Sequence, residues 1–239
     1  MDNYKQPGTT MTYTAPAGGV TSGLGYLIGA LFVVAHSTAA AAAEFEGMTE
    51  GVFELPKTIT EGDLVEGQPL YWNVGTGKVS IDPTAGLPIG TLAAAALTAA
   101  TVCDVRLNGL SLAGRMLTIR KRFTVAQVNA GATLLPALPG LKYRMVDALA
   151  LAVGGAAGAV TTVDILATAA AASRKLVAFA QASLTQSTVL RAGGAGAAVL
   201  ADGASFTQND VNTAVTIGKT GADVTVATHI DVELTYSIE

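Results

Sequence analysis

The 239-residue sequence has few aromatic residues, few charged residues and a single cysteine. Aromatic side chains make up 5% and charged side chains 13% of the chain, whereas half of its residues are apolar. Disordered chains are rich in charge and poor in apolar residues, so this composition predicts a folded protein. Cys103 has no partner for an intrachain disulfide, which fits assembly in a reducing compartment. It alternates with Val105 and Leu107 and is expected to be a buried small hydrophobe.

A secretory leader and a long apolar run are also missing. The first residues, Met1–Gly8, lack a basic start followed by an apolar stretch, so we expect no signal peptide. A spanning helix needs about 20 apolar residues. The apolar run from Leu24 to Ala35 is shorter, and His36–Thr38 interrupts its continuation into the alanines that follow. The sequence therefore predicts no membrane span.

The formal net charge of −4 is unevenly distributed. Residues 1–109 hold ten acids and four bases, a net of −6, and residues 110–239 hold eight acids and ten bases, a net of +2. This change of sign suggests two units. Neither half has the clustered Lys and Arg that a nucleic-acid surface requires, so no nucleic-acid partner is expected.

Alternation of polar and apolar residues is the clearest structural pattern. Residues 229–239 alternate without interruption, which predicts a strand with one buried face. Residues 103–108 alternate in the same way. In residues 143–153 the apolar residues at alternate, odd-numbered positions are Tyr143, Met145, Leu149, Leu151 and Val153. Residues 70–74 and 78–81 flank a Gly-Thr-Gly loop and predict a hairpin. Together these patterns predict a mainly β fold with two small β-barrel or β-sandwich domains in tandem and little helix.

Alanine tracts at residues 39–43, 93–100 and 167–172 are the ambiguous segments. Alanine is the best helix former, so at least one tract could be helical. The favoured candidate is Ala169–Leu184, in which Arg174 and Lys175 would face solvent. Elsewhere strand-like runs bracket the tracts and favour β structure.

No recognisable motif supports catalysis or cofactor binding. Gly75–Lys78 resembles part of a phosphate-binding loop, but Trp72 stands where the first glycine belongs and Val79 replaces the hydroxyl residue. The glycines at 154–158 and 193–196 lack the context of a dinucleotide-binding turn. We expect no catalytic residue and no cofactor, and an enzyme of unfamiliar type remains a minor alternative.

His229, Asp231 and Glu233 are the one constellation with metal-ligand chemistry. On a strand they share a face at spacings of about 7 Å. Three groups in a row cannot converge on one ion without help from elsewhere. A solvated strand face is therefore the favoured interpretation, and no metal site is expected.

Two short segments are possible interfaces. Arg120, Lys121 and Arg122 are three consecutive basic residues. The favoured interpretation is a solvated strand end or linker. The alternative is a basic patch that contacts an acidic surface of a partner. For Tyr71 and Trp72 the favoured interpretation is that they cover the core of the first domain. As interface anchors they would fit the enrichment of such residues in binding hot spots.

Several segments resemble a family of small phage proteins that are often encoded beside the major capsid protein and are associated with capsid decoration. The resemblance lies in residues 3–23, which start Asn-Tyr-Lys-Gln-Pro-Gly, in residues 50–57 (Glu-Gly-Val-Phe-Glu-Leu-Pro-Lys), and in residues 67–79, 89–91 and 105–109. It covers the first domain almost entirely. Residues 123–239 look like the extra outer domain of some longer phage head proteins.

The resemblance implies a protein that binds the outside of a tailed-phage capsid and stabilises the mature shell. It suggests an arm at 1–8, a capsid-binding β domain at 9–110, a linker at 111–122 and an outer β-sandwich domain at 123–239. The implied partners are the major capsid protein and two further copies of the chain in a homotrimer, on the virion exterior after assembly in the host cytoplasm. The expected capsid contacts in the arm are Asn3, Tyr4, Lys5, Gln6 and Pro7.

The main alternative is a head fibre or adsorption module whose outer domain binds host-surface glycans. Exposed aromatic residues such as Tyr143 or Tyr236 would then contact the sugar. Against it, Tyr236 lies on the apolar parity of its predicted strand.

Overall fold

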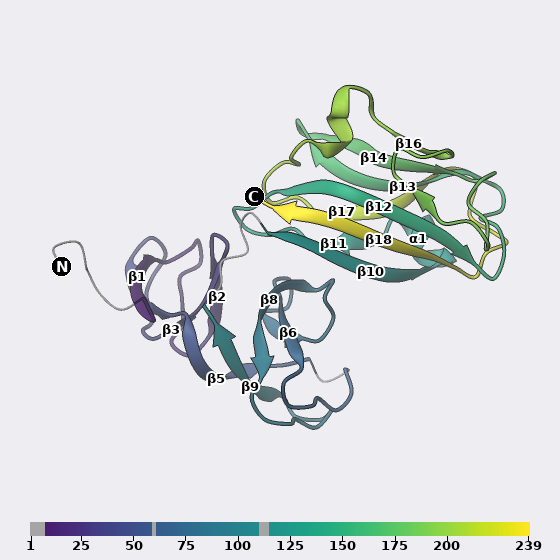
Figure 1. The fold of residues 1–239 in the computed structure, drawn as a ribbon. Coiled ribbons are helices and arrows are strands. Elements are labelled where there is room, and N and C mark those ends of the chain that lie inside the picture. Colours follow the sequence, from purple (N-terminus) through teal and green to yellow (C-terminus); the bar gives the residue numbers. More distant parts are fainter. Residues whose placement is uncertain (1–7, 59–60, 110–114) are drawn as a thin grey trace. The chain divides into compact units, whose positions relative to one another are not determined.

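A computed structural model describes residues 8–58, 61–109 and 115–239. The chain forms two compact units, residues 1–112 and 113–239. Both consist of antiparallel sheets, which confirms the predicted mainly β fold with little helix (Figure 1). No helix among the described residues is long and apolar enough to cross a membrane.

The first unit contains a four-stranded sheet of order β1-β4-β3-β2 and a five-stranded sheet of order β5-β9-β8-β6-β7. A bridge between Lys57 and Val79 joins the end of β5 to β7, so the two edges of the second sheet meet and close it into a small barrel. The strands are β1 (Thr10–Thr14), β2 (Gly25–Ile28), β3 (Leu31–Ala35), β4 (Glu44–Met48), β5 (Glu50–Pro56), β6 (Pro69–Asn73), β7 (Lys78–Ser80), β8 (Gly86–Leu92) and β9 (Val102–Asn108).

The core of the first unit follows the predicted alternation. Cys103, Val105 and Leu107 of β9 are buried, and the residues between them are exposed. Strands β6 and β7 form the expected hairpin. Trp72 of β6 packs against Phe32 of β3 with ring centroids 4.9 Å apart, so the core joins the two sheets of this unit.

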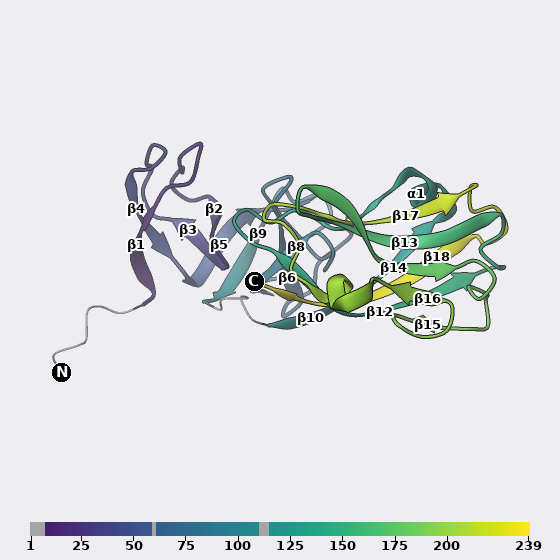
Figure 2. The ribbon, with the colours of Figure 1, turned by 90° about the horizontal axis from the view of Figure 1, so that it is seen from above.

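The second unit is a sandwich of two sheets, of order β10-β18-β12-β15 and β11-β17-β13-β14-β16 (Figure 2). The predicted C-terminal strand is confirmed as β18, which pairs with β10 on one side and β12 on the other. The elements are β10 (Met116–Thr124), α1 (Val125–Ala130), β11 (Thr133–Leu135), β12 (Tyr143–Val153), β13 (Val160–Ala169), β14 (Ala172–Ala180), β15 (Leu190–Arg191), β16 (Ala197–Val199), the 3-10 helix η1 (Ala201–Phe206), β17 (Val215–Gly221) and β18 (His229–Ile238).

The predicted linker at 111–122 is wrong in its second half. Residues 116–124 form β10, which pairs with β18 along its whole length. Ile119 and Phe123 of β10 are buried in the core, and the three consecutive bases between them obscure the alternation in the sequence. A structural link can include at most the stretch before Met116, part of which lies outside the described residues.

Strand β12 also departs from the predicted parity. The register against β18 shifts between Met145 and Asp147, which is the signature of a β-bulge. Beyond the bulge Ala148, Ala150 and Ala152 point into the core, while the leucines between them are half-buried on the opposite face. The parity that these residues share in the sequence therefore does not place Leu149, Leu151 and Val153 on the buried face of Tyr143 and Met145.

The predicted helix over Ala169–Leu184 is wrong as well. Strands β13 and β14 are joined there by a tight turn at Ala170 and Ala171, both with left-handed backbone (φ 54° and 56°). The Asp210 carboxylate accepts hydrogen bonds from both turn amides, at 3.0 and 2.8 Å. This distant partner supports a conformation that alanine rarely adopts. None of the three alanine tracts is helical in the described residues.

We expect substitutions at this turn to change the stability of the second unit in opposite directions. Asp210→Ala removes the acceptor of two exposed turn amides, which water replaces in part, and should cost about 1 kcal/mol. Ala171→Gly relieves the strain of a left-handed backbone at a residue with a Cβ, and should stabilise the second unit by about 1 kcal/mol. Ala172→Gly, one residue later and within β14, is the matched control and should destabilise slightly. Urea unfolding of the three variants checks the order, and equal effects of the two glycines would contradict it.

Candidate binding surfaces

The predicted arm contacts Asn3, Tyr4, Lys5, Gln6 and Pro7 all lie outside the described residues. Their role stays a prediction. The other predicted interface residues, in β6 and β10, lie within the described part of the chain.

The two aromatic residues of β6 are separated by the strand geometry. Successive side chains of a strand point to opposite faces. Trp72 is 6% exposed and belongs to the core, whereas Tyr71 is half-buried. The interpretation of Trp72 as an interface anchor is therefore wrong, and its core role is the one the structure shows.

The three bases of β10 do not form a single patch. Arg120 and Arg122 lie on the outer face of the sheet, where the Arg122 guanidinium donates two hydrogen bonds to the Asp231 carboxylate at 2.7 and 2.8 Å. Lys121 points the other way, with its Nζ 5.4 Å from the Phe123 ring centroid and 3.3 Å from the Thr133 carbonyl oxygen. An acidic partner surface would therefore meet two of these cations and not three.

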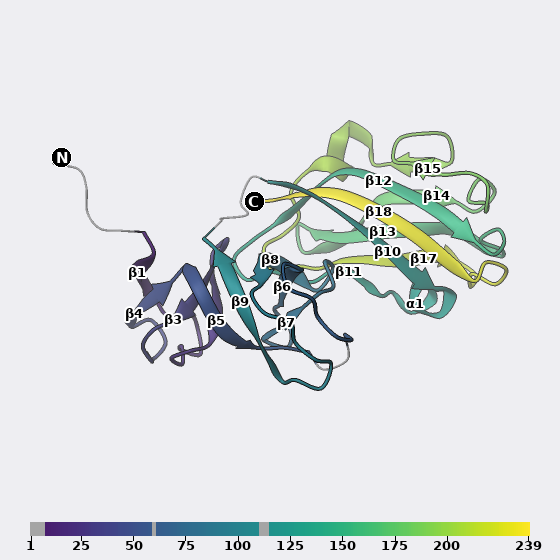
Figure 3. The same cartoon turned by 60° about the horizontal axis from the view of Figure 1, so that its bottom comes forward.

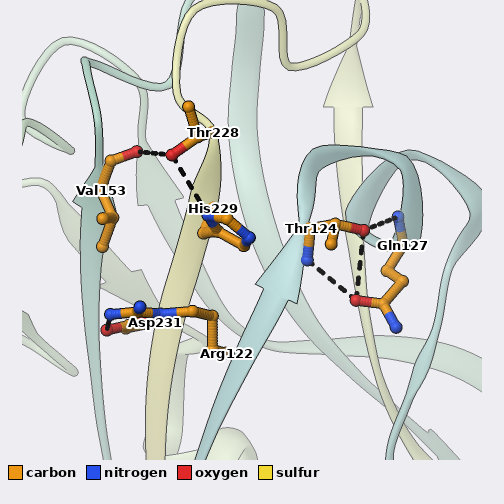
Figure 4. A network of polar contacts seen from close by, with 7 residues as sticks. All are labelled: Arg122, Thr124, Gln127, Val153, Thr228, His229 and Asp231. Carbon is orange, nitrogen blue, oxygen red and sulfur yellow. Dashed lines mark hydrogen bonds and ion pairs between the residues drawn. The ribbon is translucent and has the colours of Figure 1, made fainter.

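The Arg122–Asp231 pair is one part of a polar surface on β18 (Figure 4). Thr228 donates to the Val153 carbonyl oxygen at 3.0 Å, and the His229 ring nitrogen Nδ1 lies 3.1 Å from the Thr228 hydroxyl. The Asp231 carboxylate is thus hydrogen-bonded to Arg122 and makes no hydrogen bond with His229 or Glu233 in the part of the chain that the structure describes. At the end of β10, Thr124 and Gln127 form a reciprocal capping box that starts α1.

We expect the Arg122–Asp231 pair to make the second unit sensitive to acid. The hydrogen bonds from Arg122 hold the pKa of the Asp231 carboxyl below its usual range. When the pKa of a carboxyl is lower in the folded protein than in the unfolded chain, its ionised form stabilises the folded state. This stabilisation is complete at a pH above the pKa in the unfolded chain, about 4 for aspartate. It is lost as the pH falls through the pKa in the folded protein. Asp231→Asn should therefore lower the urea midpoint at neutral pH, and the difference from the unaltered protein should shrink towards about pH 2.

The control for this experiment is Asp202→Asn, which removes an exposed carboxylate. Its effect should be small at every pH. A deficit of Asp231→Asn that stays constant with pH would show that the carboxylate charge is not what stabilises the sheet.

An apolar groove lies on the first unit, along the tract that follows β8. We call it the alanine groove. It is open, has a volume of about 480 Å³ and is rimmed by the acids Glu54 and Asp104. Leu97 is 70% exposed beside it. The remaining lining residues are small or apolar: Ala94, Ala95, Ala96, Ala99, Ala100, Val102 and Cys103.

The loop that carries the groove is held firmly on both sides. Ala96 exchanges two backbone hydrogen bonds with Leu64, at 2.8 and 3.1 Å. The Asp63 carboxylate accepts from the Thr98 amide and hydroxyl at 2.6 and 2.8 Å, which lowers the pKa of Asp63. The buried Lys57 ammonium donates to the Thr98 carbonyl oxygen at 3.1 Å. An exposed apolar surface on a fixed loop is typical of an interaction site.

Sequence reasoning did not identify this groove. It treated residues 93–100 as a tract of uncertain secondary structure, and it gave no role to Asp63, Lys57 or Leu97. The signal in the sequence was weak, because alanine suits a helix, a strand or a tight loop. Leu97 was the one large apolar residue among these alanines.

Tyr143 and Tyr236 are not available as sugar contacts. Each is 3% exposed, and the two rings meet edge to face with centroids 5.5 Å apart. The Tyr143 hydroxyl donates to the Pro136 carbonyl oxygen at 2.7 Å, and burial raises the pKa of Tyr143. Glycan binding through these two residues is therefore wrong.

The family match to known proteins lies in the first unit. The family model described as phage cement protein matches residues 5–107, the stretch in which the sequence resemblance lies. This match supports a phage structural protein and favours a structural over an enzymatic role. A solved structure described as "The Triple Jelly Roll Fold and Turret Assembly in an Archaeal Virus" aligns with 95% of this chain and 77% of its own, at 10% identity and a TM-score of 0.33. No curated protein matches the sequence.

Proposed function

We propose that this protein binds the exterior of a tailed-phage capsid as a cement or decoration protein and stabilises the mature shell. The first unit binds the major capsid protein, and the second unit, residues 113–239, faces outward. The observation that carries the proposal is the phage cement protein match, which lies entirely within residues 1–112.

The alanine groove is the surface of the first unit best suited to this contact. Its small side chains allow the backbone of a partner to approach closely, and Leu97 can enter a pocket on that partner. Residues 1–109 carry a net charge of −6, and Glu54 and Asp104 rim the groove. We infer that the groove receives an apolar segment of the capsid protein flanked by basic residues, because such a segment matches the rim in charge.

Stabilisation of the shell needs no catalysis. A protein that binds the assembled capsid and not its dissociated subunits shifts the equilibrium towards the assembled state. We propose a homotrimer with an arm at residues 1–8 that touches the shell beside each first unit. Several modest contacts on one trimer then add to a tight attachment.

The first test is the number of copies per virion. Quantitative mass spectrometry of purified particles should give a ratio of the order of one copy per major capsid protein. A handful of copies per particle would instead favour the head-fibre alternative, and absence from the particle would refute the proposal.

We expect deletion of residues 1–8 to weaken attachment to purified capsids without unfolding either unit. The reason is multivalency, since loss of one modest contact per copy is multiplied over a trimer. Occupancy can be measured by cosedimentation with capsids, and folding by the urea midpoint. Normal occupancy of the truncated protein would refute the arm, and would leave the role of the groove to be tested separately.

A further inference from the structure

On the outer face of the sheet β10-β18-β12-β15, the strands β10, β18 and β12 each present a row of side chains. The three rows lie side by side and differ in chemistry. The three long strands run alongside one another in Figure 3. Their register places Arg120 of β10 opposite Glu233 of β18, and Glu233 opposite Leu149 of β12. One step along, Arg122 lies opposite Asp231, and Asp231 opposite Leu151. A cationic, an anionic and an aliphatic row are thus neighbours at the spacing of adjacent strands, about 4.8 Å.

A hollow of about 150 Å³ lies on this face. Leu149, Leu151 and Val189 form its apolar part, and Val189 is 60% exposed. The β-bulge in β12 is what turns the two leucines outward. A second, more open hollow adjoins the first, because Arg120 and Asp231 line both.

Of the four charged side chains around the hollow, two pair with each other and two do not. Arg122 and Asp231 satisfy each other through two hydrogen bonds. Arg120 and Glu233 face one another across two paired strands, yet neither side chain has an ion pair or hydrogen bond within the residues that the structure describes. One guanidinium and one carboxylate therefore remain available beside an aliphatic surface.

The chemistry of this surface selects a class of ligand. Its charges balance, so it offers no net attraction to a polyanion or a polycation. Arg120 supplies hydrogen-bond donors only, and Glu233 supplies acceptors only. A sugar ring carries hydroxyls that both donate and accept around its edge, and it has an apolar C–H face. We propose that this hollow binds a neutral saccharide, with Arg120 and Glu233 on its hydroxyls and Leu149, Leu151 and Val189 against its C–H face.

This site is distinct from the capsid contact, since it lies wholly on the second unit. It also differs from the glycan contact expected from the sequence, because the two tyrosines of that hypothesis are buried. A saccharide site here would let a particle-bound protein hold polysaccharide. The capsid proposal can fail without affecting it.

The test is an NMR titration of the full chain with glucose, galactose, N-acetylglucosamine and their linear trisaccharides. The expected result is a set of shifts confined to the methyl groups of Leu149, Leu151 and Val189 and the Nε–H of Arg120. Glu233→Gln and Arg120→Gln should each weaken binding about tenfold, the usual effect of losing a hydrogen bond to a charged group. Arg115→Gln and Glu66→Gln remove exposed charges elsewhere and are the matched controls.

Three outcomes would overturn the proposal. The first is the lack of any saccharide shift up to about 20 mM, well above the dissociation constant expected of a shallow site. The second is a set of shifts that the Glu233 and Arg120 variants leave unchanged. The third is a response at these residues only to an oligo-aspartate or oligo-lysine peptide, which would identify a protein partner. Urea midpoints of the variants show whether weakened binding reflects the lost contact or a loss of folding.

Discussion

Replacing Leu97 by aspartate is expected to reduce binding to mature capsids about 100-fold while leaving both units folded. Leu97 is 70% exposed, so the free protein loses little by the change. In the proposed complex the side chain is buried in an apolar contact, where an unpaired carboxylate is strongly unfavourable. The acids already on the rim, Glu54 and Asp104, would add repulsion. Cosedimentation with purified capsids over a range of protein concentrations measures the effect.

The matched control is Val226→Asp, which places the same charge on a 59% exposed valine of the second unit. It should bind capsids normally. Equal binding by the Leu97 and Val226 variants would exclude the alanine groove as the capsid contact. It would direct attention to the residues of the predicted arm.

Replacing Trp72 by alanine is expected to unfold the first unit selectively, with a loss of about 3–5 kcal/mol. The side chain is buried against Phe32 in the core that joins the two sheets of this unit, so its removal leaves a large cavity. The second unit has its own core and should keep its stability. Hydrogen exchange followed by mass spectrometry reports on the two units separately.

Tyr71→Ala provides the comparison, because Tyr71 is the neighbouring aromatic residue and is only half-buried. Its loss should cost much less stability than that of Trp72. A Trp72→Ala protein that stays fully protected but no longer binds capsids would reverse the assignment and restore Trp72 as an interface residue.

Much of the fold could be predicted because its strands alternate visibly. Strand β18 and strand β9 show period two, since each buries one face and exposes the other. The β6–β7 hairpin was predicted for a similar reason, because its glycine loop stands between two apolar runs. Such features depend on residues close together in the sequence.

The errors arose where a distant residue decides the local conformation. The turn at Ala170 and Ala171 depends on Asp210, about 40 residues further along the chain. The bulge in β12 is defined only by its register against β18. Strand β10 was mistaken for linker because its charged residues face outward or lie at the edge, and only pairing with β18 shows this.

The binding surfaces were harder to predict than the fold. Tyr71, Trp72 and the three bases of β10 were identified by residue type, but strand geometry sends adjacent side chains in opposite directions. The alanine groove depends on contacts from Asp63 and Lys57 that hold an otherwise featureless loop. The saccharide hollow requires three strands to be in register, and its two leucines share their sequence parity with the buried Tyr143 and Met145.

The place of β18 has a consequence for how the second unit is synthesised. In its sheet β18 stands between β10 and β12, which do not pair with each other. The ribosome makes β10 and β12 early and β18 after every strand of the opposite sheet. Until β18 leaves the exit tunnel, β10 has no strand beside it and β12 pairs only with the short strand β15, so both have an unpaired edge. The first unit precedes all of these strands and contains its own core, so it can fold during translation while the second unit waits for its last strand.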